Sequence, residues 1–484
     1  MEELYAIFGI IDSILFGYGI ATFISYIILA FLSSLALFFY IRKNRFIDYS
    51  VILSSDIAPS VSVIAPAYNE EKSIVDNARS LMSLQYLNIE IIIVNDGSKD
   101  NTLQRLIDNF QLKKIVYISN YKIECKDIRG IYKSENKAFQ KLIVIDKENG
   151  GKADALNAGI NISSNDLITC IDVDCIIEQD AILKMVKPFL EETDKRVIAS
   201  GGVVRVANNC DVGIGRINTV RFPNKLIAGF QVLEYLRAFI LGRMAWSRIN
   251  GLLLISGAFG MFRKDLVIKV GGYDHNTVGE DMELVVRMRK YMHDNNLGKY
   301  IVSFIPDPLC WTEVPETFKV LGRQRNRWTR GTIETLAIHK ELLFNPKYGL
   351  LGMVSYPYWL FFEWLAPYVE VFGLFYFFVL IYLHKVNWIF FFSLLGFVYT
   401  FAFMFTLFSI LFEEVTFNAY KRKLDILKMI GLALIEPLFY HLFIMWWAAK
   451  GNISYFKGEK AWGKMDRTGF STQQTKIVES EITL

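Results

Sequence analysis

The sequence predicts an α/β domain with a mainly parallel sheet, flanked by α-helical transmembrane segments. Hydrophobic residues make up 52% of the chain and aromatic residues 15%, which is too apolar for a wholly soluble protein of this length. The apolar residues concentrate near the N-terminus and after about residue 345. Between them, strand-like and helix-like segments alternate, which is typical of parallel strands joined by helices.

The first element, residues 1–45, is expected to be one transmembrane helix. No charged residue lies between Asp12 and Arg42, and at helical rise this stretch is longer than a hydrocarbon core of about 30 Å. The basic group at residues 42–45 follows directly, so the positive-inside rule places the next domain in the cytosol. The sequence therefore predicts an integral protein of the plasma (inner) membrane.

The second element, residues 59–317, is the predicted α/β domain. Its first strand-to-helix turn lacks the GxGxxG pattern, which argues against a dinucleotide-binding domain. The net charge of +4 is small for this length, so we expect no nucleic-acid partner. The five cysteines show no CxxC spacing and are expected to be reduced core residues. The expected strands are Val61 to Ala65, Ile89 to Asn95, Lys141 to Asp146, Asp166 to Ile171 and Val197 to Val206.

The remaining elements return the chain to the bilayer. Residues 318–345 are expected to form an interfacial helix, 346–449 a bundle of three or four crossings, and 450–484 a tail. With three crossings the tail emerges outside, and with four the basic loop at residues 421–423 does. Both alternatives remain open. Acidic residues within the bundle, such as Glu436, predict either the lining of a polar path through the membrane or interhelix pairs.

Two carboxylates, Asp172 and Asp174, follow the apolar run that ends at Ile171. On a strand, residues two apart share a face, so the two acids would repel unless a positive group lay between them. Oxygen donors at this spacing suit Mg²⁺ or Mn²⁺, which commonly completes its shell with substrate phosphates. The alternative is that one acid caps a helix and the other faces solvent.

Two further candidate binding motifs lie at or just after the ends of predicted strands. Asp96 ends the second strand, where its carboxylate could accept a hydrogen bond from a base N–H or simply form an Asx-turn. Residues 150–157, GGKADALN, form a small-residue loop that opens a helix. Its backbone N–H groups and Lys152 could bind phosphate, although an ordinary helix start with a surface lysine has the same pattern.

The last two signals lie further along the chain. Asp281, in the first turn of an amphipathic helix that follows Gly279, could act as a general base or only favour the helix dipole. The segment QRNRW at residues 324–328 is expected to begin a basic helix. There Arg327 could clamp a diphosphate and Trp328 could stack on a sugar, although a juxtamembrane basic segment has the same composition.

In this order, the motifs resemble those of the membrane-embedded family 2 glycosyltransferases, which include hyaluronan, chitin, cellulose and poly-N-acetylglucosamine synthases. The resemblance covers roughly residues 60 to 335 and implies a GT-A fold for the α/β domain. It also extends to residues 256–263 and to a tryptophan-glycine segment at Trp462. The motifs that carry it are APAYNE at residues 65–70, Asp96, Lys152, the Asp172/Asp174 pair, Glu280-Asp281 and residues 324–328.

The resemblance implies a role for each matching residue. Asp281 would be the catalytic base, and Asp174 would bind Mg²⁺ or Mn²⁺ with Asp172 beside it. Trp328, Glu280 and Gly257 would contact the acceptor sugar. The implied donor-binding residues are Pro66, Ala67, Tyr68, Glu70, Asp96, Lys152, Asp172, Gln324 and Arg327.

The function implied is inverting transfer from a UDP-sugar, UDP-N-acetylglucosamine or UDP-glucose, to a growing β-linked polysaccharide. We expect the synthase to be processive and to move its product through its own helices in the lipid bilayer, with accessory export proteins as possible partners. One alternative is transfer of a single sugar to a lipid or oligosaccharide. Another is an inactive transporter or scaffold, which would not require the four acids Asp96, Asp172, Asp174 and Asp281.

Overall fold

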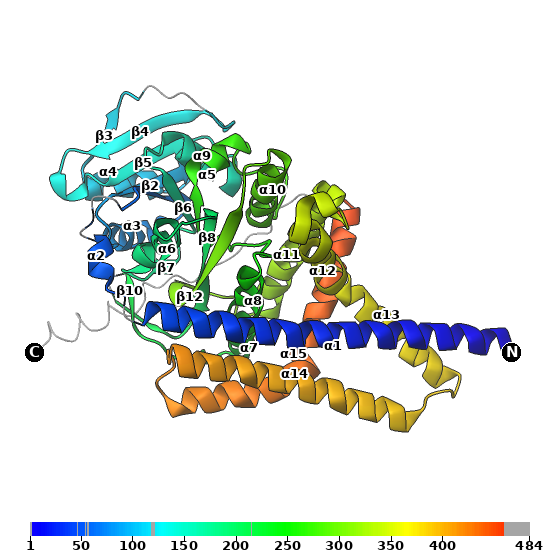
Figure 1. Cartoon of the computed structure of the whole chain (residues 1–484). Helices are drawn as coiled ribbons and strands as arrows, with labels where there is room; N and C mark the ends of the chain where they lie inside the picture. The colour runs from blue at the N-terminus through cyan, green and yellow to red at the C-terminus, as the bar shows by residue number, and fades with distance from the viewer. Residues whose placement is uncertain are drawn as a thin grey trace, which may run out of the picture. The chain divides into compact units, whose positions relative to one another are not determined.

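The computed structural model describes residues 2–45, 47–53, 55, 58–117, 122–213 and 215–458, which fall into two compact units (Figure 1). We call them the membrane unit and the sheet unit. The membrane unit contains residues 2–45, 225–252 and 316–458, and the sheet unit contains residues 47–224 and 253–315. Residues 225–252, which were expected within the α/β domain, thus group with the membrane helices.

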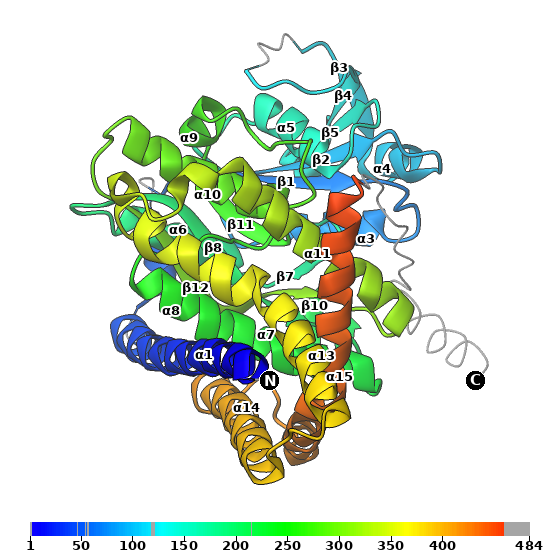
Figure 2. The ribbon, with the colours of Figure 1, turned by 90° about the vertical axis from the view of Figure 1, so that its right-hand side faces the viewer.

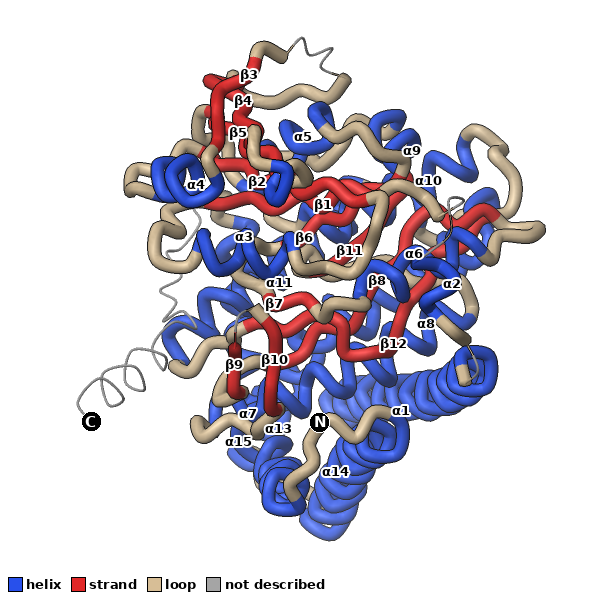
Figure 3. The backbone as a smooth tube through the Cα atoms, turned by 90° about the vertical axis from the view of Figure 1, so that its left-hand side faces the viewer, coloured by secondary structure: helices blue, strands red, loops and turns tan. Residues whose placement is uncertain are grey.

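The sheet unit is built on a ten-stranded mixed sheet among its described residues (Figure 3). The strand order is β3-β4-β5-β2-β1-β6-β11-β8-β12-β7. The strands are β1 (Val61–Ala67), β2 (Ile89–Asp96), β3 (Leu112–Ile115), β4 (Ile128–Ser134), β5 (Leu142–Lys147), β6 (Leu167–Ile171), β7 (Ile176–Ile177), β8 (Arg196–Val206), β11 (Phe259–Arg263) and β12 (Tyr300–Thr312).

The centre of the sheet is parallel, as the sequence predicts. Strand β1 pairs in parallel with β2 and β6, and β2 pairs in parallel with β5. Ile91 to Val94 on β2 are fully buried, because a parallel strand has both faces covered and therefore reads as a continuous apolar run. All five predicted strands are present. The carboxyl ends of β1, β2 and β6 lie at one edge of the sheet, where the predicted motifs occur.

Helices of the sheet unit connect these strands, and a short hairpin completes it. The hairpin consists of β9 (Asp211–Gly213) and β10 (Arg216–Thr219). The helices are α2 (Tyr49–Leu53), α3 (Ile74–Met82), α4 (Thr102–Phe110), η1 (Lys137–Phe139), α5 (Lys152–Ile162), α6 (Ala181–Leu190), α9 (Lys264–Lys269) and α10 (Glu280–Asp294).

The membrane unit has, among its described residues, four helical stretches long and apolar enough to cross a membrane. They are Ala6–Asn44, Leu351–Tyr382, Trp388–Thr416 and Lys423–Phe456, so three follow the sheet domain. Their elements are α1 (Glu2–Asn44), η5 (Leu351–Ser355), α12 (Tyr356–Tyr358), η6 (Trp359–Trp364), α13 (Ala366–Tyr382), α14 (Trp388–Thr416) and α15 (Lys423–Phe456). The unit also contains α7 (Leu226–Tyr235), η2 (Leu236–Arg243), α8 (Met244–Arg248), α11 (Phe318–Ile338), η3 (Lys340–Leu342) and η4 (Pro346–Tyr348).

Helix α15 bends within the membrane unit. Its first half lies beside α14 and its second half turns toward α11 and α13 (Figures 1 and 2). Pro437 lies inside this helix, and an internal proline removes a backbone hydrogen bond and kinks a helix. The preceding residue, Glu436, forms a two-pronged ion pair with Arg237 of η2, and His441 lies 3.0 Å from Glu370. These contacts are interhelix pairs, which was one of the two explanations expected for acidic residues within the bundle.

Helix α11 packs closely against the second half of α15. A Cβ at Gly322 would lie 2.6 Å from Trp447 Nε1, and a Cβ at Gly451 would lie 3.0 Å from the carbonyl oxygen of Asn326. Helix α11 begins at Phe318, the residue at which the interfacial helix of residues 318–345 was expected to begin. The segment at residues 324–328 therefore lies inside this helix and does not start it. The Thr317 side chain accepts a hydrogen bond from Val320 N and caps the helix earlier.

Candidate active site

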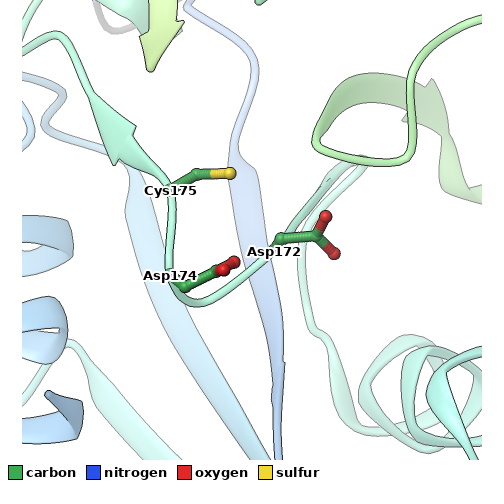
Figure 4. Close-up of side chains that lie close together, drawn as sticks. All are labelled: Asp172, Asp174 and Cys175. Carbon is green, nitrogen blue, oxygen red and sulfur yellow. The ribbon is translucent and has the colours of Figure 1, made fainter. Parts of the chain in front are cut away.

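The carboxylate pair lies in a tight turn after β6. Strand β6 ends at Ile171, and Cys175 N donates to the carbonyl oxygen of Asp172 at 3.0 Å. The sequence predicted that the two acids share one face of a strand. They lie in a turn after the strand instead, so this expectation is wrong. Figure 4 shows that the side chains of Asp172, Asp174 and Cys175 all come from this one turn.

The donor set of this turn fits a hard divalent cation. One possible ligand atom from each of Asp172, Asp174 and Cys175 lies within 4.8 Å of the others. A hydrogen bond with the Cys310 thiol, together with burial, raises the pKa of Cys175 well above its ordinary value. The carboxylates of Asp172 and Asp174 are the oxygen donors that Mg²⁺ and Mn²⁺ prefer, whereas a cysteine sulfur is a softer donor.

Lys152 supplies the positive charge next to this pair. It is the first residue of α5, after Gly151, which has a φ of +89° that favours glycine. Its ammonium forms an ion pair with Asp172 and donates to the carbonyl oxygen of Gly257 at 3.2 Å. Burial lowers the pKa of Lys152, but the charges of Asp172 and Glu280 more than offset this, so the net pKa is raised. Lys152 is a cation at neutral pH.

Gly257 joins Lys152 to Asp281. Its N–H donates to Asp281 Oδ2 at 2.9 Å, while Met282 N donates to Asp281 Oδ1 at 2.8 Å. These two backbone donors, one to each oxygen, fix the orientation of the carboxylate. A Cβ at Gly257 would lie 3.1 Å from Lys152 Nζ and 3.3 Å from Asp281 Oδ2. Glycine therefore allows these two side chains to approach one another.

Asp96 is held by four donors. Its Oδ1 accepts from Lys147 Nζ at 2.8 Å and Gly150 N at 3.0 Å, and its Oδ2 accepts from Gly151 N at 2.8 Å and the Asn149 side chain at 3.2 Å. The residue Asp96 is 4% exposed. In this state Asp96 anchors the loop before Lys152, and the predicted contact with uridine remains a prediction.

The end of β1 presents the other predicted donor residues. Pro66 and Ala67 are the last residues of β1, and Tyr68 is 46% exposed. Asn69, with a φ of 55°, accepts from Lys99 N at 2.8 Å and donates through its own N–H to Ser98 Oγ at 3.0 Å. The loops after β1 and β2 are therefore tied together, and the expected contact of Tyr68 with uridine remains a prediction.

Comparison with known proteins decides the family. A family model described as glycosyl transferase family 2 matches residues 62–269, and one described as glycosyl transferase family group 2 matches residues 167–407. The chain belongs to glycosyltransferase family 2. This family 2 glycosyltransferase is therefore an enzyme, and its mixed, largely parallel sheet has the predicted GT-A fold.

Similar proteins include two staphylococcal synthases. The poly-beta-1,6-N-acetyl-D-glucosamine synthase of Staphylococcus aureus is 31% identical over 301 residues, which is 62% of this chain and 61% of that protein. The Staphylococcus epidermidis synthase of the same name is 29% identical over 303 residues, with the same coverage. The glycosyltransferase thus aligns with less than two thirds of these relatives. A solved mannosyltransferase from Pyrobaculum calidifontis, in complex with GDP-Man and Mn²⁺, is 15% identical with a TM-score of 0.48 and covers 91% of this chain and 99% of that chain.

The remaining predicted residues of the glycosyltransferase lie on α11 in the membrane unit. Gln324 is buried and Trp328 is 40% exposed. The Arg325 guanidinium lies 4.1 Å from the centre of the Trp328 ring and donates to Glu234 Oε2 at 2.8 Å. The predicted donor contacts of Gln324 and Arg327 and the acceptor contact of Trp328 remain predictions. The segment at Trp462 lies outside the described residues.

Sequence reasoning missed several residues that organise this glycosyltransferase site. Lys147 ends a buried strand and pairs with Asp96, but its acidic neighbours Asp146 and Glu148 do not indicate which carboxylate it meets. Asn157 belongs to the GGKADALN loop and helix, but its role depends on a contact with Tyr273. In the membrane unit, Arg325 lies within the QRNRW segment, where Gln324, Arg327 and Trp328 were the expected site residues. The one available signal was that a polar residue in an apolar run needs a partner.

Proposed function

We propose that this chain transfers a sugar from a UDP-sugar to the end of a growing β-linked polysaccharide, with inversion at the anomeric carbon and with Mg²⁺ or Mn²⁺. UDP-N-acetylglucosamine is the favoured donor, ahead of UDP-glucose, because the staphylococcal relatives are named for poly-N-acetylglucosamine synthesis. The four apolar helices support a reaction at the plasma (inner) membrane, with the sheet unit in the cytosol.

One observation carries the proposal. Asp172 and Asp281, more than a hundred residues apart in the chain, are joined by Lys152 and by the backbone of Gly257. A cation that can neutralise a diphosphate therefore lies between a candidate metal ligand and a candidate base. Transfer of a glycosyl group needs these functions together, because negative charge develops on the leaving group while the acceptor loses a proton.

In the proposed step, the acceptor hydroxyl oxygen attacks the anomeric carbon as the bond from that carbon to the diphosphate breaks. The hydroxyl proton passes to Asp281, and UDP leaves with the bonding electron pair. Lys152 donates to the departing diphosphate. Asp172 and Asp174 would hold the divalent ion, whose chemistry here is to neutralise charge on the diphosphate.

The base is tested by Asp281→Asn. This variant keeps the shape of the side chain but cannot accept a proton, so we expect kcat to fall by about 10²–10⁴-fold while UDP binding is retained. The measurements are UDP release with a panel of UDP-sugars and calorimetric binding of UDP. Asp265→Asn is the matched control, since Asp265 also lies in the first turn of a helix but pairs with Arg196. Near-normal turnover of the Asp281 variant would show that the base is wrongly assigned.

The metal is tested by chelation. We expect EDTA to abolish UDP release and added Mn²⁺ or Mg²⁺ to restore it, because the diphosphate is otherwise only partly neutralised. Asp174→Asn should raise the metal concentration needed for half-maximal rate. Asp180→Asn is the control, since that residue follows β7 and pairs with Lys184 instead. Full activity in EDTA would rule out the metal-dependent reaction.

Product size distinguishes the polymerase from its alternative. A processive synthase yields long chains while most of the donor is still unused, whereas transfer of a single sugar to a lipid or oligosaccharide yields one short product. Purified protein with UDP-N-acetylglucosamine and the restoring metal should therefore give long glycan on a sizing gel. A product extended by one sugar only would support the alternative.

A further inference from the structure

A turn at residues 270–273 lies between α9 and α10 in the sheet unit. Gly271 and Gly272 have φ values of +88° and +74° there, which glycine adopts without strain. A Cβ at Gly272 would lie 2.5 Å from Asn157 Oδ1. Glycine is therefore needed at Gly272 both for the backbone conformation and for the approach of Asn157.

Asn157 holds this turn through both ends of its amide. Its Nδ2 donates to the carbonyl oxygen of Tyr273 at 2.9 Å, and its Oδ1 accepts from Tyr273 N at 2.7 Å. Asn157 is 1% exposed, so these bonds have little competition from water. The same helix, α5, begins at Lys152.

The opposite side of the turn is held by α10. Arg287 donates to the carbonyl oxygens of Val270 and Gly272, the latter at 2.7 Å, and forms an ion pair with Glu283 at 2.6 Å. Helix α10 carries Asp281 in its first turn. One turn therefore contacts both the helix that presents Lys152 and the helix that presents Asp281.

The turn also reaches the strand that leads to the carboxylate pair. The buried side chain of Tyr273 lies next to the Cys170 thiol. Cys170 lies on β6, two residues before Asp172. Tyr273 is 3% exposed. The base, the lysine and the candidate metal ligand are thus all attached to elements that meet at this turn.

We infer that Asn157 is a positioning residue that sets the place of Asp281 relative to Lys152 by holding the backbone of Tyr273. The inference rests on the proposed function, since it concerns the proposed base. Asn157 itself need not touch either substrate. Its loss would let the start of α10 shift relative to α5, and a misplacement of about 1 Å can cost a reaction about 10²-fold.

The same helix offers a matched control. Asn161 lies one turn beyond Asn157, and its amide also holds a loop, accepting from Lys122 N and Ile123 N at 3.1 Å and donating to the carbonyl oxygen of Ile123 at 2.8 Å. That loop leads to β4, which is the neighbour of the edge strand β3. The two asparagines thus share chemistry, but only Asn157 hydrogen-bonds the turn before Asp281. The loop held by Asn161 meets that turn through the side chain of Ile123, which lies beside Gly272.

The experiment compares Asn157→Ala with Asn161→Ala in the full-length protein. We expect the first to lower kcat by about 10–100-fold with UDP affinity unchanged, and the second to leave kcat at its normal value. Hydrogen exchange should show loss of protection at the Tyr273 amide only in the first variant. If Asn157→Ala does not accumulate, Asn157→Ser and Asn161→Ser provide the same comparison, because serine is too short to bridge both groups.

Normal kcat in the Asn157 variant, or equal losses in the two variants, would overturn the inference. Asp281→Asn is measured in parallel. Normal turnover of that variant would refute the proposed base, whereas loss of turnover there combined with equal behaviour of the asparagine variants would refute only the positioning role.

Discussion

At the scale of residues, the main feature of the sheet unit is a buried lysine between two acids. Lys147 is fully buried and pairs with Asp96 at 2.8 Å and Asp154 at 2.5 Å. Burial lowers its pKa, but the hydrogen bonds of Asp154 and Asp96 more than offset this, so the net pKa is raised and the lysine stays charged. The cluster holds the loop before Lys152, because Asp96 accepts hydrogen bonds from Gly150 N and Gly151 N while Lys147 also pairs with Asp154 of α5.

Removing this lysine should be costly. Lys147→Met leaves two acids buried without their shared cation, and breaking such a buried pair costs about 3–5 kcal/mol. Lys113→Met is the control, since Lys113 pairs with Glu135 on the surface with side chains 68% and 70% exposed; there we expect a loss below about 1 kcal/mol. Thermal unfolding of the purified protein measures both, and equal small shifts would contradict a stabilising role for the cluster.

At the scale of elements, the position of α5 depends on how closely it packs on the sheet. Gly159, in the middle of α5, faces the centre of the sheet, where a Cβ would overlap Ile64 and lie 3.3 Å from Val94 Cγ2. Ile64 and Val94 lie on the neighbouring strands β1 and β2 and are fully buried. The absence of a side chain therefore lets α5 come close enough to present Lys152 at the carboxyl ends of the strands.

Gly159→Ala tests this packing. Helix propensity alone favours alanine by about 1 kcal/mol, but overpacking of a core typically costs about 1–3 kcal/mol, so we expect a net lower unfolding temperature. We also expect reduced turnover, since Lys152 would be displaced. Gly396→Ala on α14 is the control, because a Cβ there meets nothing within 4 Å. Stabilisation of the Gly159 variant would show that α5 can move without cost.

At the scale of the whole molecule, the number of apolar helices favours one of the two membrane topologies that the sequence left open. Three apolar helices follow the sheet domain. If α1, α13 and α14 each cross once, the basic groups after α1 and before α15 lie on the same side of the membrane. That arrangement satisfies the positive-inside rule for both groups, and a complete crossing by α15 would then place the chain beyond Phe456 outside.

A cysteine in place of Lys421 tests this topology. In intact cells we expect an impermeant thiol reagent to label it only after permeabilisation, because the connection between α14 and α15 would face the cytosol. The background is a variant with all five native cysteines replaced. A cysteine at Asn387, which caps the start of α14, should show the opposite pattern. Labelling of residue 421 in intact cells would reverse the assignment.

The sequence by itself determined the fold class, five strands of the main sheet and the helices that start at Lys152 and Glu280. These features follow from local patterns, since apolar runs, glycine turns and first-turn acids act over a few residues. It also identified Asp172, Lys152, Gly257 and Asp281 as candidates, although only through the resemblance of ordered motifs for Gly257.

Only the tertiary structure decided which of these residues meet. Asp172 faces Lys152 because β6 and the start of α5 share one end of the sheet, and Asp281 joins them through Gly257. The roles of Lys147 and Asn157 depend on partners about 50 and 116 residues away. Hydrogen bonds over such separations depend on how the strands are ordered, and strand order is not encoded in any local pattern.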